Sequence, residues 1–87
     1  MAKTVDGKRM KKQTDIALGK RIAKLRRRFG FKRQEDFAAA LGVTRAAVGN
    51  WERGAGCGLQ NIRLVCEQFN VSPDWLMIGR GEMIRAF

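Results

Sequence analysis

The sequence predicts a single, compact all-α domain of five helices. Apolar residues recur three and four positions apart in several segments, which is the period of an amphipathic helix. No segment shows the alternation of apolar and polar residues that marks a strand. Aromatic residues make up only 8% of the chain, and there is one proline. With 87 residues, 45% of them hydrophobic, the chain has enough apolar surface for one small core.

Three regions are expected along the chain. Residues 1–13 are polar and basic and have no apolar period, which predicts a flexible arm. Residues 14–81 contain all five helical patterns and form the folded domain. Residues 82–87 form a C-terminal tail whose apolar residues make it a possible dimer contact.

The positive charge is concentrated in the first third of the chain. Residues 1–33 contain 13 Lys and Arg against Asp6 and Asp15, a net charge of +11. Residues 34–87 contain five Arg against six acidic residues, a net charge of −1. A basic end of this kind suits a polyanionic partner. A basic tail that serves only solubility is the alternative.

Cysteine and histidine content argues against a metal site or a disulfide framework. The chain has two cysteines, nine residues apart, and no histidine. Nothing resembles a signal peptide, and the longest apolar stretch is too short to span a bilayer. We therefore expect a reduced, cytoplasmic protein with no membrane partner and no cofactor. Cys66 is expected to fill the core of a helix, and Cys57, among glycines in a loop, is expected to be an exposed thiol.

The first helix is expected to begin near Asp15, because Thr14 and Asp15 are both competent N-terminal caps. Basic residues occupy its outer faces. Gly30 ends the pattern. The residues at helical spacing on its apolar face are Leu18, Ile22, Leu25 and Phe29.

Residues 34–54 have the pattern of a helix-turn-helix. The first helix of the motif ends at Gly42, which is expected to adopt the left-handed conformation. Thr44 caps the second helix, because its hydroxyl can accept from free N–H groups of the first turn. Small side chains are expected where the two helices approach: Ala38, Ala39, Ala46 and Ala47. The residues expected to face the core are Phe37, Ala38, Leu41, Ala47, Val48 and Trp51. In such motifs the second helix enters the DNA major groove.

Two further helices follow a loop at residues 55–58. The fifth helix opens with Ser72 as cap, Pro73 in the first helical position and Asp74 at the positive helix end. Gly79 and Gly81 break its pattern. The apolar face of the fourth helix is expected to consist of Leu59, Ile62, Val65, Cys66 and Phe69, and that of the fifth of Trp75, Leu76 and Ile78.

Four blocks of residues resemble one family of regulators. They are Ile22-x-x-Leu25-Arg26, Gln34-x-x-Phe37-Ala38-x-x-Leu41-Gly42-Val43-Thr44, Val48-x-x-Trp51-Glu52-Arg53-Gly54 and Val71-Ser72-Pro73-Asp74-Trp75-Leu76. Together they are similar to the phage repressor/Cro class of helix-turn-helix proteins, the XRE family. The resemblance covers about residues 16–80. It implies a lambda-repressor-like DNA-binding fold.

The resemblance implies a role for each matching position. Arg45, Ala46 and Asn50 would contact base edges. Glu52 would pair with an arginine of the first helix, either Arg26 or Arg27. The residues that would contact the DNA backbone are Gln34, Thr44 and Arg53, with Lys32 and Arg33 beside them. Hydrogen-bonding chemistry agrees for the base contacts, because Arg can bind guanine O6 and N7, Asn can bind adenine N6 and N7, and a methyl group suits thymine. The alternative is that these residues are simply exposed.

The expected function is sequence-specific binding of a double-stranded DNA operator, as a phage repressor or a Cro-like protein. Members of this class pair through the C-terminal helix, so a homodimer on a palindromic operator is expected. The candidate dimer residues are Trp75, Ile78, Met83 and Ile84. An antitoxin or a coactivator-type interaction module is the alternative on the same fold. An enzyme with a small-molecule substrate is not expected, because no clustered carboxylates, histidine or tyrosine could form a catalytic site.

Overall fold

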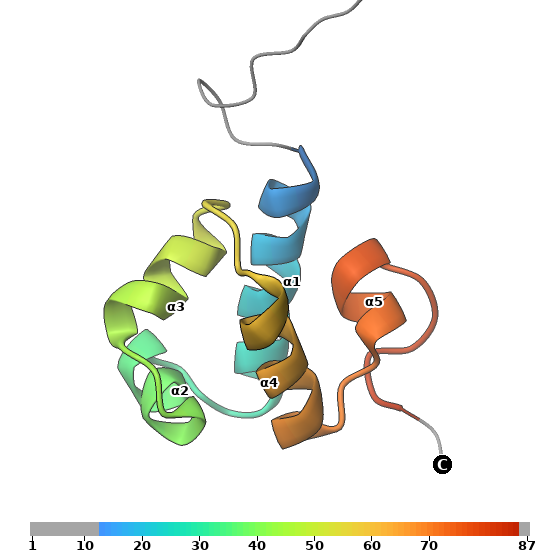
Figure 1. Ribbon diagram of the computed structural model, residues 1–87. Helices are drawn as coiled ribbons and strands as arrows, with labels where there is room; N and C mark the ends of the chain where they lie inside the picture. Colours follow the sequence, from blue (N-terminus) through green and yellow to red (C-terminus); the bar gives the residue numbers. More distant parts are fainter. Residues whose placement is uncertain (1–12, 86–87) are drawn as a thin grey trace, which may run out of the picture.

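The computed structural model describes residues 13–85 of the chain, and these fold into five helices (Figure 1). The helices are α1 (Gln13–Arg28), α2 (Gln34–Leu41), α3 (Arg45–Glu52), α4 (Leu59–Phe69) and α5 (Pro73–Ile78). No strand forms within residues 13–85, where Val71 and Ile84 make one isolated antiparallel bridge. The all-α, five-helix prediction is confirmed. The expected N-terminal arm lies outside the described residues, except that Gln13 already belongs to α1.

Figure 1 shows α1 at the centre of the domain, with α2 and α3 on one side and α5 on the other. The pairs α1–α3 and α2–α3 make the most extensive contacts. The helix-turn-helix is therefore held against α1 as a unit, and α4 closes the core between α2 and α5.

The predicted caps form the helix boundaries of the motif and of α5. The Thr44 hydroxyl accepts from the backbone N–H of Ala47 at 3.1 Å, and the Ser72 hydroxyl accepts from that of Trp75 at 3.3 Å. Gly42 ends α2 in the left-handed conformation, with φ of 76°. Each interaction satisfies a backbone group that a helix end leaves without a partner. The turn between α2 and α3 is therefore determined locally by Gly42 and Thr44.

The core contains one continuous cluster drawn from all five helices. Four phenylalanines pack together in it: Phe37 stacks on Phe69 with ring centroids 5.6 Å apart, and Phe29 and Phe31 pack around Phe69. The buried apolar residues are Leu18, Ile22, Leu25, Phe37, Ala38, Leu41, Val48, Trp51, Cys57, Ile62, Val65, Cys66, Val71, Trp75 and Leu76.

The structure corrects the prediction that Cys57 is exposed. Cys57 does lie in the loop before α4, but its side chain is buried, and Asn61 Nδ2 donates to its carbonyl at 2.8 Å. This contact turns the loop back over the start of α4. Burial, reinforced by the nearby Cys66, raises the pKa of the Cys57 thiol to about 12. Both cysteines are free and buried in the core.

The prediction that Leu59 lies on the buried face of α4 is wrong. It is the first residue of that helix and is 72% exposed. Helical spacing places it on the same face as Ile62, but the element across from it is the short α5, which does not cover it.

The alanines of the motif are not all at a close helix crossing. Ala38 is buried and Ala47 is half-buried, whereas Ala39 and Ala46 are exposed. A close approach between helices lies instead at Gly19 of α1. A Cβ atom built there would be 2.3 Å from the carbonyl oxygen of Trp51 and 2.9 Å from that of Glu52. Gly19 therefore permits α1 to contact the C-terminal end of α3.

Candidate nucleic-acid interface

The outer face of α3 carries the residues predicted to read DNA. Arg45, Ala46, Asn50 and Arg53 are exposed, while Val48 and Trp51 on the inner face are buried. Eight residues of regular helix give α3 a length of ~12 Å. A convex helix of this size, anchored on one side and open on the other, has the shape that enters a major groove.

The polar groups on this face are already partly organised. Arg53 Nη2 donates to Asn50 Oδ1, so the two side chains one turn apart are held together. An amide oxygen has two lone pairs and an amide nitrogen has two protons. Asn50 therefore keeps the acceptor and donor capacity that adenine recognition requires. Within residues 13–85, Arg45 has no ion-pair partner, and its guanidinium extends from the first turn of the helix.

The predicted backbone-contact residues lie at the edges of this face. Thr44 uses its hydroxyl oxygen as an acceptor in capping α3, which leaves its O–H to donate outward. Lys32 is exposed in the turn before α2. Arg33 bonds Asp36 at 3.2 Å and lies 3.4 Å from Glu35. The Asp36 hydrogen bond and these two negative charges raise the pKa of Arg33 above its usual value.

A buried polar network behind the face connects α1, α2 and α3. Glu52 accepts from Arg26 Nε at 2.7 Å, from Arg26 Nη2 at 3.2 Å and from Gln34 Nε2 at 2.9 Å. Arg26 Nη1 also donates to the carbonyls of Phe31 and Lys32, at 2.9 and 2.8 Å. The arginine that pairs with Glu52 is thus Arg26 and not Arg27. Charge-assisted bidentate bonds of this kind fix orientation as well as distance.

Gln34, predicted to contact a DNA phosphate, also takes part in this network. Its side chain lies behind α3, bonded to Glu52, rather than pointing only outward. One proton of the Gln34 amide is used in that bond, and the second is available to a phosphate. In addition, α2 has no side-chain cap at its N-terminus, so the first backbone N–H groups of that helix also have no side-chain acceptor.

Sequence reasoning missed two residues that position the interface. One is Gly19, whose lack of a side chain lets α1 pack on α3. A glycine within a helical pattern reduces helix stability, and this cost is the sequence signal that indicates a packing role for Gly19. The other is Arg21, which donates to the carbonyls of Leu76 and Met77 at 2.7 and 3.0 Å. It fastens the end of α5 to α1, and no local sequence pattern reveals that contact.

Three of the four candidate dimer residues are engaged within the protomer. Trp75 is buried in the core, Met83 packs against that core, and Ile84 forms the bridge with Val71. The backbone of residues 83–85 lies along residues 70–72, where Ser72 N–H donates to the Met83 carbonyl at 2.8 Å. Ile78 alone among the four is well exposed, at 62%.

Comparison with known proteins agrees with this geometry. A family model described as helix-turn-helix matches residues 22–76, which include α2, α3 and the whole Glu52 network. The chain belongs to this helix-turn-helix family of phage repressor/Cro-like regulators. It is therefore a DNA-binding transcriptional regulator, and the family is not enzymatic.

Among solved structures, the regulator is similar to the P22 c2 repressor, whose structure was determined in complex with a synthetic operator in the presence of Tl+. The two share 28% sequence identity, with a TM-score of 0.63 over 72% of this chain and 96% of the other. No curated protein matches the regulator significantly. None of the helices within residues 13–85 combines the length and the apolar character needed to cross a bilayer.

Proposed function

We propose that this regulator binds a specific double-stranded DNA operator through the outer face of α3, as a phage repressor or Cro-like protein. The exposure of Arg45 and Asn50 on a helix whose opposite face is fully packed carries the proposal. The Arg26–Glu52–Gln34 network supports it, because it fixes the recognition helix before DNA arrives. A preorganised helix loses less conformational freedom on binding.

Each contact has a defined chemistry. The Arg45 guanidinium donates two parallel hydrogen bonds to guanine O6 and N7, and Asn50 addresses adenine N6 and N7. The Ala46 methyl group lies against a thymine methyl. Thr44, Gln34 and Arg53, together with Lys32 and Arg33, contact phosphates at the edges of the groove. Such contacts set the register on the duplex, and base contacts supply the specificity.

The substitution Arg45→Ala should reduce discrimination rather than general affinity. Loss of a bidentate guanine contact costs ~1–3 kcal/mol per half-site, so the ratio of operator to random-duplex affinity should fall at least ~10-fold. Arg80→Ala, which removes an exposed arginine from the loop after α5, should leave that ratio unchanged. The operator is obtained by selection from a random duplex pool, and affinities are measured by fluorescence anisotropy.

The same measurement over a range of salt concentrations tests DNA binding itself. Neutralising about six phosphates per dimer should give a slope of log affinity against log salt near −5. An unchanged specificity ratio for Arg45→Ala would refute its base contact. A chain that binds no duplex even at low salt would refute the proposed function as a whole.

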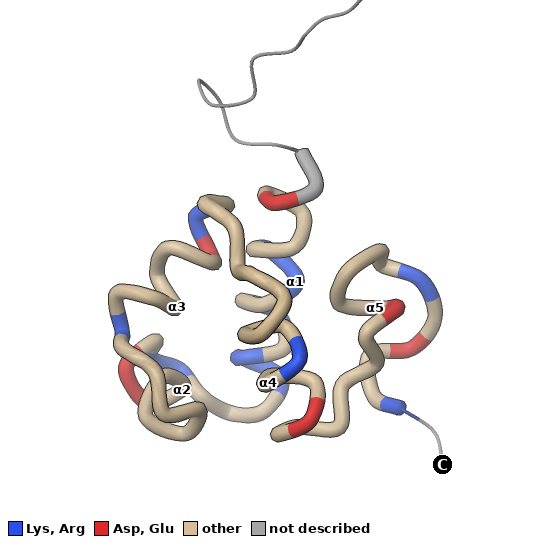
Figure 2. The backbone as a smooth tube through the Cα atoms, in the orientation of Figure 1, with Lys and Arg blue, Asp and Glu red and all other residues tan. Residues whose placement is uncertain are grey.

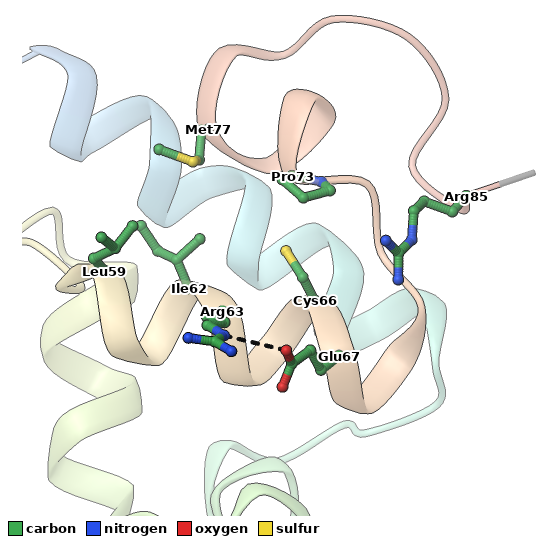
Figure 3. A pocket seen from close by; sticks show the side chains of 8 residues that line it. All are labelled: Leu59, Ile62, Arg63, Cys66, Glu67, Pro73, Met77 and Arg85. Carbon is green, nitrogen blue, oxygen red and sulfur yellow. Dashed lines mark hydrogen bonds and ion pairs between the residues drawn. The ribbon is translucent and has the colours of Figure 1, made fainter.

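We further propose that the regulator binds a palindromic operator as a homodimer, through the groove between α4 and α5. Figure 3 shows this groove, a cavity of about 320 Å³ lined by Leu59, Ile62, Arg63, Cys66, Glu67, Pro73, Met77 and Arg85. The large apolar residues that the described chain exposes are Leu59 and Met77, which line it, and Ile78, which follows Met77. A second copy is the occupant that the charges favour. The rim carries the Arg63–Glu67 pair, whose opposite signs are self-complementary about a two-fold axis.

Ile78→Asp should therefore weaken self-association while preserving the fold, because this side chain is already largely in solvent. A charge in an apolar contact should raise the dimer dissociation constant at least ~10-fold. Ala40→Asp places the same charge at an exposed position on α2 and serves as the control. Sedimentation equilibrium of the full chain measures both. A wild-type protein that stays monomeric, free and on a palindromic duplex, would contradict the homodimer.

A further inference from the structure

The distribution of cations over the domain is unexpected for a protein whose DNA-reading face is α3. That face and its edges carry Arg45, Arg53, Lys32 and Arg33, and the last of these is paired with acidic neighbours. Helix α1 alone carries six Lys and Arg, four of which are exposed. We define the α1 basic face as the four exposed residues Lys20, Lys24, Arg27 and Arg28.

These four residues lie on one side of α1. Successive residues of an α-helix are ~100° apart, so Lys20, Lys24 and Arg27 fall within ~60° of one another. They lie opposite the core-facing residues Leu18, Ile22 and Leu25, all of which are buried. Gly19 and Arg26, which contact α3, lie about a third of a turn away. The α1 basic face thus points away from the core and away from the line along which α1 meets the recognition helix.

Local structure does not account for these charges. Cations in the last turn of a helix interact favourably with its dipole. This interaction explains the presence of Arg27 and Arg28, but not that of Lys20 and Lys24, which lie before the last turn. Lys24 follows Lys20 by four residues and precedes Arg28 by four, and like charges at this spacing destabilise a helix. The only acidic residue of α1 is Asp15, in its first turn (Figure 2). No member of the face forms an ion pair within residues 13–85.

The chemistry of the face favours a phosphate backbone over a protein partner. Protein interfaces depend on a few buried aromatic, arginine or aliphatic anchors. The large exposed apolar residues of the described chain, Leu59, Met77 and Ile78, lie on α4 and α5 instead. A row of cations ~12 Å long without an apolar anchor provides only sequence-independent attraction to a polyanion.

We infer that the α1 basic face binds a second segment of duplex DNA, so that the regulator joins two duplexes. One is read by α3, and the other is held by its phosphates regardless of sequence. This inference rests on the proposed operator binding but concerns a different surface. It gives a function to the positive charge on α1, which operator binding through α3 does not explain.

The experiment measures energy transfer between a donor-labelled operator duplex and an acceptor-labelled random duplex in the presence of the full-length chain. Wild-type protein should bring the two together, with a steep loss of transfer as salt increases. The triple variant Lys20→Gln, Lys24→Gln, Arg27→Gln should lower the bridging affinity at least ~10-fold at low salt. It should keep operator affinity, measured alone, within about threefold. Glutamine has a helix propensity close to that of Lys and Arg, so circular dichroism should show an intact fold.

A matched control lowers the net charge by the same three units elsewhere. The variant Arg80→Glu, Gln68→Glu has the same net charge as the face variant, and both residues are exposed and lie outside the lining of the groove between α4 and α5. It should retain bridging. Equal loss of bridging in the face variant and in its control would show a net-charge effect and overturn the inference. Loss of operator affinity as large as the loss of bridging would place the face on the same duplex, which also overturns it. Operator binding without bridging by wild type refutes this inference alone, whereas absence of any duplex binding refutes the proposed function.

Discussion

Glu52→Ala should destabilise the domain by about 3–5 kcal/mol, the range expected when one partner of a buried ion pair is removed. The Arg26 guanidinium, only 7% exposed, would lose its counter-charge, and Gln34 would lose its acceptor. The total stability of a small domain is ~5–15 kcal/mol, so the denaturant midpoint should fall markedly. Urea unfolding followed by tryptophan fluorescence measures this, because Trp51 and Trp75 are both buried.

The control for Glu52→Ala is Glu67→Ala. Glu67 pairs with Arg63 at 3.2 Å, but both side chains are more than 60% exposed. Solvent screens such a pair, and its removal should cost less than about 1 kcal/mol. The double variant Arg26→Met, Glu52→Met should recover part of the loss, because neither charge then remains buried alone. A small effect of Glu52→Ala would mean that the network contributes little to holding α3.

The parts of the fold that were predictable are those determined over a few residues. Thr44, Ser72 and Gly42 have one favourable local role each, as hydroxyl caps and as a left-handed helix end, and the structure uses them in those roles. The spacing of Ile22 and Leu25 likewise identifies the buried face of α1 whatever the partner is. For such residues, the groups that determine the local structure lie at most about one helical turn apart in the sequence.

The errors concern contacts between segments distant in sequence. Cys57 is buried because its loop folds back over α4, and the glycines around it give no indication of that path. Leu59 continues the apolar period of α4, yet periodicity does not tell how far the neighbouring helix extends. The phosphate contact predicted for Gln34 stays a prediction, but its hydrogen bond with Glu52, eighteen residues later, follows from no local pattern. Predicting that hydrogen bond requires the crossing geometry of α2 and α3.

Gly19→Ala should destabilise the domain although it adds only one methyl group. The added Cβ would lie 2.3 Å from the Trp51 carbonyl oxygen and 2.9 Å from that of Glu52. Both atoms belong to the backbone, so α3 itself has to shift, and the side chain of Glu52 shifts with it. We expect a loss of at least ~2 kcal/mol, even though alanine favours helix over glycine by ~1 kcal/mol. Operator affinity should fall too, since α3 would be displaced from its place against α1.

Gly49→Ala provides the matched comparison, because it adds the same methyl group to another helical glycine. Its nearest neighbours are the ends of two side chains, Arg53 Nη1 at 3.3 Å and Gln34 Oε1 at 3.4 Å. These can move by a few tenths of an ångström, so the helix-propensity gain should leave stability within about 1 kcal/mol of wild type or above it. Thermal and urea unfolding of the two variants compares them directly. If Gly19→Ala unfolds at the same midpoint as Gly49→Ala, α1 does not hold α3 through backbone contact, and the buried Arg26–Glu52 pair alone must position the recognition helix.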